Sequence, residues 1–175
     1  MVRSGGFDGS RKVPRPTFKS KSCSGANEVK VSLVWSSPKP ERTIATAMRR
    51  CYSTKPIEGI EAELEEKGPE YWRFLLSKAL QDKSLDVLEH YTMTLLLEGV
   101  QGDDVCALIV AHPHLRASML KVGSWLVSLN ARTLVELWKD PKSRGFAELA
   151  ISELNGKGIG LLFNELAFGA NKGAS

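Results

Sequence analysis

The spacing of apolar side chains changes along the chain, and each change predicts a different kind of element. Residues 29–35 alternate apolar with polar side chains, which is the period of a half-buried β-strand. From Pro40 to about Pro56 the apolar positions return every three or four residues, as in an amphipathic helix. These positions are Ile44, Ala47, Met48, Cys51 and Tyr52. A strand followed by a helix is therefore expected here.

The next stretch combines an acidic half with an apolar half. Residues 58–70 carry six glutamates, and the narrow apolar stripe of Ile57, Ile60 and Leu64 predicts at most a short, exposed helix. After Gly68-Pro69, aromatic and aliphatic side chains recur at helical spacing as far as Asp82. A second, firmer helix with a core-facing side is expected from there.

Residues 90–98 alternate again and predict a second strand. His90, Thr92 and Thr94 fall on one face of this strand, which would make a polar row that needs hydrogen-bond partners if it is buried. The opposite face is apolar and consists of Tyr91, Met93, Leu95 and Leu97. On sequence alone, the row that includes His90 fits a satisfied core network and the wall of a ligand site equally well.

The second half of the chain repeats the alternation of helix and strand. A helix is expected from Asp103-Asp104 to about Pro113, a strand over residues 118–129, and a helix capped by Asn130 that ends at Pro141. A last helix over residues 146–154 is interrupted by glycines before Leu161-Leu162. The pattern predicts an α+β fold with a central antiparallel or mixed sheet flanked by helices.

Length and charge divide the chain into three parts. The 175 residues suffice for one domain, expected over residues 29–168, with a short tail over residues 169–175. Residues 1–28 are predicted to form a basic, flexible arm. The net charge of residues 1–30 is +5, which leaves −1 for the other 145. This arm fits a solubilising tail, or a contact to nucleic acid or an acidic partner.

Composition argues against several classes of protein. The longest apolar run spans only residues 105–111, far below the ~20 residues of a membrane-spanning helix, and no secretory signal precedes it. We therefore expect a cytoplasmic protein with no membrane contact. Cys51 and Cys106 are expected to be reduced packing residues. His112 and His114 are expected at the surface, and no spacing of ligands predicts a metal site.

Three segments, in sequence order, resemble motifs of the flavin-dependent thymidylate synthase family. Residues 40–53 are similar to that family's first helix, which ends in a Cys-Tyr-Ser stretch. Residues 88–95 resemble its Glu-His motif and the strand that follows. Residues 125–134 resemble the strand that leads into its Asn-Ala-Arg helix. The resemblance extends over about residues 29–155.

The resemblance implies a fold, a cofactor and an assembly. Members of the family are α+β homotetramers that bind FAD and dUMP where subunits meet, and methylate the uracil with a folate donor. By this resemblance, His90, Thr94, Asn130 and Arg132 are expected to bind FAD, and Arg144 to bind the nucleotide substrate. No catalytic residue is assigned.

The resemblance is incomplete at the residues that hold phosphates. The family's Arg-His-Arg-x-x-Ser signature should follow residue 100, but the chain continues directly into Asp103-Asp104. The family also has an arginine eleven residues after the motif asparagine, and here that position is Pro141. The basic side chains nearby are Lys139, Lys142 and Arg144.

Three functions follow from these observations. The first is a homologue that has lost thymidylate synthesis and keeps a weakened flavin or nucleotide pocket near His90 and Asn130. The second is an active enzyme whose phosphate ligands come from Arg116, Lys121 or the basic arm of a neighbouring subunit. The third is a cofactor-free oligomeric scaffold, or a protein that binds nucleic acid or an acidic partner through its arm.

Overall fold

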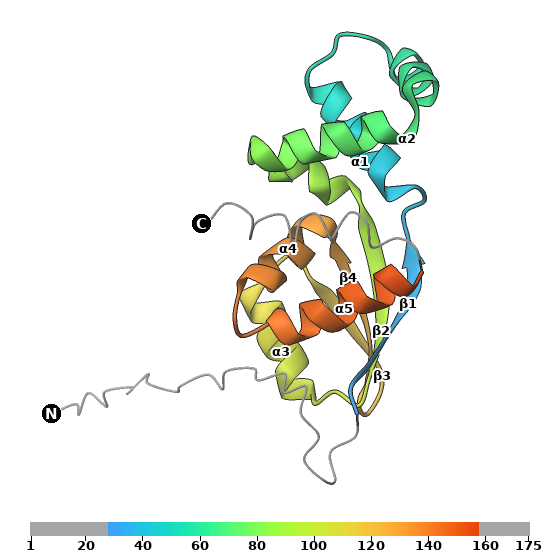
Figure 1. Cartoon of the computed structure of the whole chain (residues 1–175). Helices are drawn as coiled ribbons and strands as arrows, with labels where there is room; N and C mark the ends of the chain where they lie inside the picture. The colour runs from blue at the N-terminus through green and yellow to red at the C-terminus, as the bar shows by residue number, and fades with distance from the viewer. Residues whose placement is uncertain (1–27, 158–175) are drawn as a thin grey trace, which may run out of the picture.

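The computed structural model describes residues 28–157 and shows an α+β fold with one four-stranded antiparallel sheet (Figure 1). The strands lie in the order β1-β2-β4-β3, so β1 and β3 form the edges. The strands are β1 (Lys30–Ser36), β2 (Thr92–Glu98), β3 (Arg116–Lys121) and β4 (Ser124–Asn130). The helices are α1 (Pro40–Cys51), α2 (Ile57–Gln81), the 3₁₀-helix η1 (Leu85–His90), α3 (Gly102–Ala111), α4 (Ala131–Lys139) and α5 (Arg144–Gly156).

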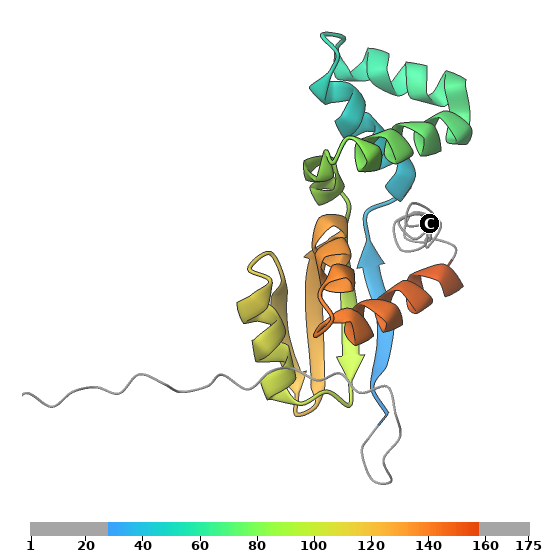
Figure 2. The same ribbon diagram turned by 60° about the vertical axis from the view of Figure 1, so that its left-hand side comes forward.

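The apolar core lies on one face of the sheet. Tyr91 and the alternate β2 residues Met93, Leu95 and Leu97 are buried, as the alternation in the sequence predicted. The register places Leu95 opposite Val127 of β4, so two central strands contribute to the same core face. Helices α3, α4 and α5 cover this face (Figures 1 and 2). On the opposite face, the side chains of the two central strands are partly exposed, among them Thr94, Leu96, Leu126 and Ser128. Within residues 28–157, helices therefore cover the sheet on one side only.

Helices α1 and α2 pack against each other beyond one end of the sheet (Figure 2). The acidic segment forms a short helix whose surface is mostly exposed, as expected, but its apolar stripe belongs to the core, because Ile60 and Leu64 are completely buried. Non-helical backbone at Gly68, whose φ of 72° suits glycine, separates this helix from the following apolar helix, so α2 consists of two helices joined at a kink, as the Gly68-Pro69 pair predicted. Trp72 stabilises the kink by donating its indole N–H to the Leu64 carbonyl at 2.7 Å.

Two predicted strands differ in their bounds. The second strand begins at Thr92 rather than His90, because residues 85–90 form η1 and His90 is its last, exposed residue. The single strand expected over residues 118–129 is a hairpin of β3 and β4. The chain reverses at Val122-Gly123, where Gly123 has a φ of 75° that a side chain would disfavour. The glycine was thus the signal for the turn.

Three further expectations about burial were wrong. Cys51 and Cys106 are exposed, and Cys51 is the last residue of α1. His112 is buried, because the chain turns inward after α3 and reaches the loop between α4 and α5. There its Nε2 lies 3.3 Å from the Ser143 hydroxyl, which donates to Asp140 at 2.7 Å. This contact links α3 to the start of α5.

Two expectations concern the C-terminal part of the chain, and a third concerns membrane-spanning helices. The expected domain boundary at residue 168 and the Leu161-Leu162 pair lie outside the described residues. Within residues 28–157, no helix combines the length and the apolar character needed to cross a bilayer.

The burial of Leu64 can be tested by comparing two truncations on the same helix. Leu64→Ala should lower the free energy of unfolding by about 2–5 kcal/mol, because it leaves a cavity where α2 packs on α1. Ile57→Ala is the control, since Ile57 is 41% exposed and should cost less than about 1 kcal/mol. Urea unfolding followed by circular dichroism measures both. Equal losses would contradict the packing of α1 on α2.

Candidate functional site

A groove lies between α1, the start of α2 and the end of η1, with a volume of about 690 Å³. We call it the α1–α2 groove. It is the cavity that contains His90, a residue singled out by the Glu-His motif. The residues that line it are Pro38, Lys39, Arg42, Thr43, Thr46, Ala47, Arg50, Cys51, Ile57, Glu61 and His90. The exposed area of the lining is mostly apolar, and the charges in the lining are mostly positive.

Helical spacing explains why the cations share one wall. Arg42, Thr46 and Arg50 follow each other at intervals of four residues, so they form a stripe along one side of α1. Ile44 and Met48 lie on the buried side of the same helix. The apolar side holds α1 on the fold and thereby directs the basic stripe into the groove.

The acidic residues of α2 do not cancel this charge. Glu63 accepts hydrogen bonds from Lys55 (2.9 Å), Lys67 (3.1 Å) and Arg49 (3.2 Å), all outside the groove lining. The bond from Lys55, with those from Lys67 and Arg49, lowers the pKa of Glu63 to about 2. Glu63 therefore stays ionised and paired with these three cations.

Within the groove itself, cations outnumber carboxylates. Glu61 is the one carboxylate in the lining, against Lys39, Arg42 and Arg50. Arg42 also forms an exposed ion pair with Glu65 at 3.5 Å, which a competing anion can replace at small cost. Arg50 donates one N–H to the Lys55 carbonyl at 3.0 Å. Because a carbonyl is neutral, this contact does not compensate the positive charge of Arg50. The groove is thus suited to an anionic ligand.

Of the expected cofactor residues, His90 alone lines the groove. Thr94 lies in the middle of β2, on the solvent-facing side of the sheet, where its hydroxyl is 2.9 Å from that of Ser128. The structure therefore separates His90 from the threonine that was expected to share its strand face, because the chain changes from η1 to β2 between them.

Asn130 and Arg132 are close to the Glu-His motif but are engaged in local contacts. Asn130 caps α4, since its Oδ1 accepts from the backbone N–H of Thr133 at 2.8 Å, as the sequence predicted. The Arg132 guanidinium donates to Glu89 at 2.6 Å and to Glu136 at 3.1 Å. These two carboxylates, Glu136 foremost, raise the pKa of Arg132. A bound anion would have to compete with both carboxylates for the Arg132 guanidinium.

Arg144 lies at the other end of α4. Its Nε donates to the Trp138 carbonyl at 3.0 Å, and its guanidinium lies 5.8 Å from the centre of the Trp138 ring. Because α4 has nine residues, its two ends are about 13 Å apart along the helix axis. Within one subunit, the fold therefore holds Arg144 away from the Asn130 cap.

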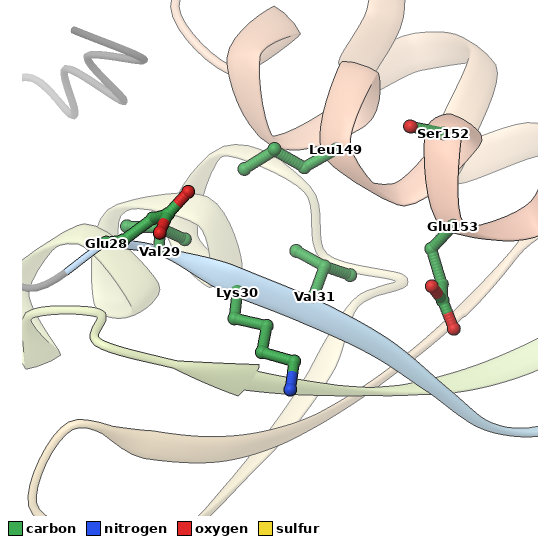
Figure 3. A pocket seen from close by; sticks show the side chains of 7 residues that line it. All are labelled: Glu28, Val29, Lys30, Val31, Leu149, Ser152 and Glu153. Atoms are coloured by element: carbon green, nitrogen blue, oxygen red, sulfur yellow. The ribbon is translucent and has the colours of Figure 1, made fainter. Parts of the chain in front are cut away.

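A second cavity of about 420 Å³ lies between β1 and α5 (Figure 3). Figure 3 shows Val31 and Leu149 facing each other across it, with Glu153 reaching from α5 toward β1. Glu153 accepts the Leu33 backbone N–H at 3.0 Å, so it satisfies a donor on the outer edge of the sheet. With Glu28 and Glu153 in its lining, this cavity is poorly suited to an anion.

The basic stripe of α1 was missed in the sequence. Arg42 and Arg50 lie outside the apolar stripe of Ile44, Met48 and Cys51, and their four-residue spacing with Thr46 was the available signal. The spacing alone did not show that α2 and His90 would enclose that side.

Neither a search for metal ligands nor a comparison with known proteins assigns a ligand to this site. Among residues 28–157, no cluster of three or more histidine, cysteine, aspartate or glutamate side chains has an arrangement able to hold a metal ion. No protein-family model matches the chain, and no curated protein matches it.

The two roles of Asn130 can be separated by two substitutions. Asn130→Ala should destabilise the protein by about 1 kcal/mol, because it removes the α4 cap, whereas Asn130→Asp keeps an acceptor oxygen and should cost much less. Urea unfolding measures the difference. A ligand-binding defect shared by both variants would assign the amide group to the ligand, and equal instability of both would contradict the capping role.

Proposed function

We propose that this chain is a divergent flavin-dependent thymidylate synthase-like protein that binds a phosphate-bearing flavin or nucleotide in the α1–α2 groove. We further propose that it does not catalyse thymidylate synthesis on its own. The observation that carries the proposal is the grouping of Lys39, Arg42 and Arg50 around His90, against one carboxylate. Arginine side chains bind phosphate oxygens through two N–H groups at once, which suits this ligand class.

The contacts of the other expected residues support a weakened pocket. Arg132 already donates to Glu89 and Glu136, so an anionic cofactor would gain little from it. Arg144 bonds a backbone carbonyl at the far end of α4. Together with the missing arginine-rich signature, these contacts favour retained binding over retained chemistry. The homotetramer implied by the resemblance belongs to the same proposal.

Binding can be tested by titrating the full chain with FAD and following flavin fluorescence, with dUMP as a competitor. Arg50→Ala should weaken FAD binding by about tenfold, because it removes charge-assisted hydrogen bonds to phosphate. Arg73→Ala is the matched control, since Arg73 lies on α2, pairs with Glu41 and does not line the groove. Absence of FAD and dUMP binding, or equal losses in both variants, would overturn the proposal.

Catalysis is tested separately by tritium release. The purified protein should release no tritium from dUMP labelled at the carbon that becomes methylated, even with FAD, reduced nicotinamide and methylene folate present. The physical reason is the loss of the donors that would clamp nucleotide and flavin phosphates together. Release above a control without enzyme would favour the alternative, an active enzyme in which groove cations replace the missing signature.

A further inference from the structure

The solvent-facing side of the sheet brings together residues that are far apart in the sequence. We call this side the open sheet face. The strand register arranges its side chains in three rows that run from β1 to β3. The rows are Trp35-Thr94-Ser128-Arg116, Ser32-Leu96-Leu126-Ser118 and Lys30-Glu98-Ser124-Lys121. Bulges in β1 and β3 place Val34 beside Trp35 and Leu120 beside Lys121. The face therefore combines hydroxyl groups with apolar side chains, and it has an aromatic ring on β1 and basic side chains on both edge strands.

The aromatic ring and the charges are accessible. Trp35 is 53% exposed, and Lys30, Arg116 and Lys121 are exposed as well. Figure 3 shows Lys30 pointing to the side of β1 opposite α5, which places it on the open sheet face. Glu98 is the one carboxylate in the three rows, so their net charge is positive. In the sequence, residues 1–29, which precede β1, hold six basic residues against Asp8 and Glu28.

We propose that the open sheet face binds single-stranded nucleic acid. An unpaired base would stack on Trp35, and the phosphates would be bound by Arg116, Lys121 and Lys30. Aromatic side chains on a sheet are suitable stacking platforms, because every base has a π-face. Trp35 and Arg116 end the same row, about 14 Å apart for four strands at the usual spacing. A strand that crosses the sheet would contact both.

The composition of the face favours nucleic acid over a second copy of the chain. Two copies packed face to face would bring the three cations of each copy, Lys30, Arg116 and Lys121, into the same interface, and like charges brought together in an interface oppose association. A duplex is also disfavoured, because its bases are stacked on each other and a flat sheet face cannot reach their edges. The proposal is independent of ligand binding in the α1–α2 groove.

The test uses the full chain and a fluorescently labelled oligonucleotide of about 12 nucleotides, as oligo(dT) or oligo(U). Fluorescence anisotropy should show salt-sensitive binding. Trp35→Ala should weaken binding at least about fivefold, because one stacked base is lost. Arg116→Ala should weaken it and reduce the slope against log salt by about 1. Phe74→Ala and Lys139→Ala are the matched controls, since both residues are exposed on helices away from this face.

The outcomes separate this proposal from its competitors. Preference for the single strand over a duplex, loss in Trp35→Ala, and unchanged FAD titration of that variant would support it. Binding that depends only on Arg11, Lys12 and Arg15 would show that segment 1–30 acts alone and would overturn it. Absence of oligonucleotide binding would also overturn it. A dimer that dissociates on Trp35→Ala would assign the face to a second copy instead.

Discussion

The antiparallel pairing of β2 with β4 is the contact on which the arrangement of the molecule depends. It brings Met93 and Leu95 against Leu129 and Val127 and so forms the centre of the core. Burial of these apolar side chains is the main interaction that holds α3, α4 and α5 on the sheet. The same register fixes which side chains remain on the open sheet face, because successive residues of a strand point to opposite sides.

This pairing also determines where the two motifs of the sequence meet. Thr92, the first residue of β2, lies opposite Asn130, the last residue of β4. The Ala131 backbone N–H donates to the Tyr91 carbonyl at 2.9 Å, which joins the start of α4 to the end of η1. As a result, Glu89 and Arg132 form an ion pair although they belong to segments far apart in the chain. The Glu89-His90 motif and the Asn130-Ala131-Arg132 motif therefore interact through this ion pair.

The chain has two basic surfaces of different chemistry. The α1–α2 groove is concave and surrounds His90 with arginines, which suits a compact anion. The open sheet face extends over all four strands. Its cations lie on the two edge strands and its exposed tryptophan lies on β1, an arrangement that suits an extended polyanion. Six glutamates lie on α2, and one of them, Glu63, pairs with Lys55, Lys67 and Arg49 outside the groove.

The sequence by itself determined the α+β class, the core face of β2 and the cap of α4, because each depends on local periodicity or on one side chain bonding the nearby backbone. Tertiary contacts decided the rest. Ile60 and Leu64 are buried because α1 covers them, and His112 is buried because the loop after α4 reaches it. The stripe of Arg42 and Arg50 became a groove, and Trp35 came to share a row with Arg116, only through packing and register. Contacts between distant segments are invisible to local periodicity.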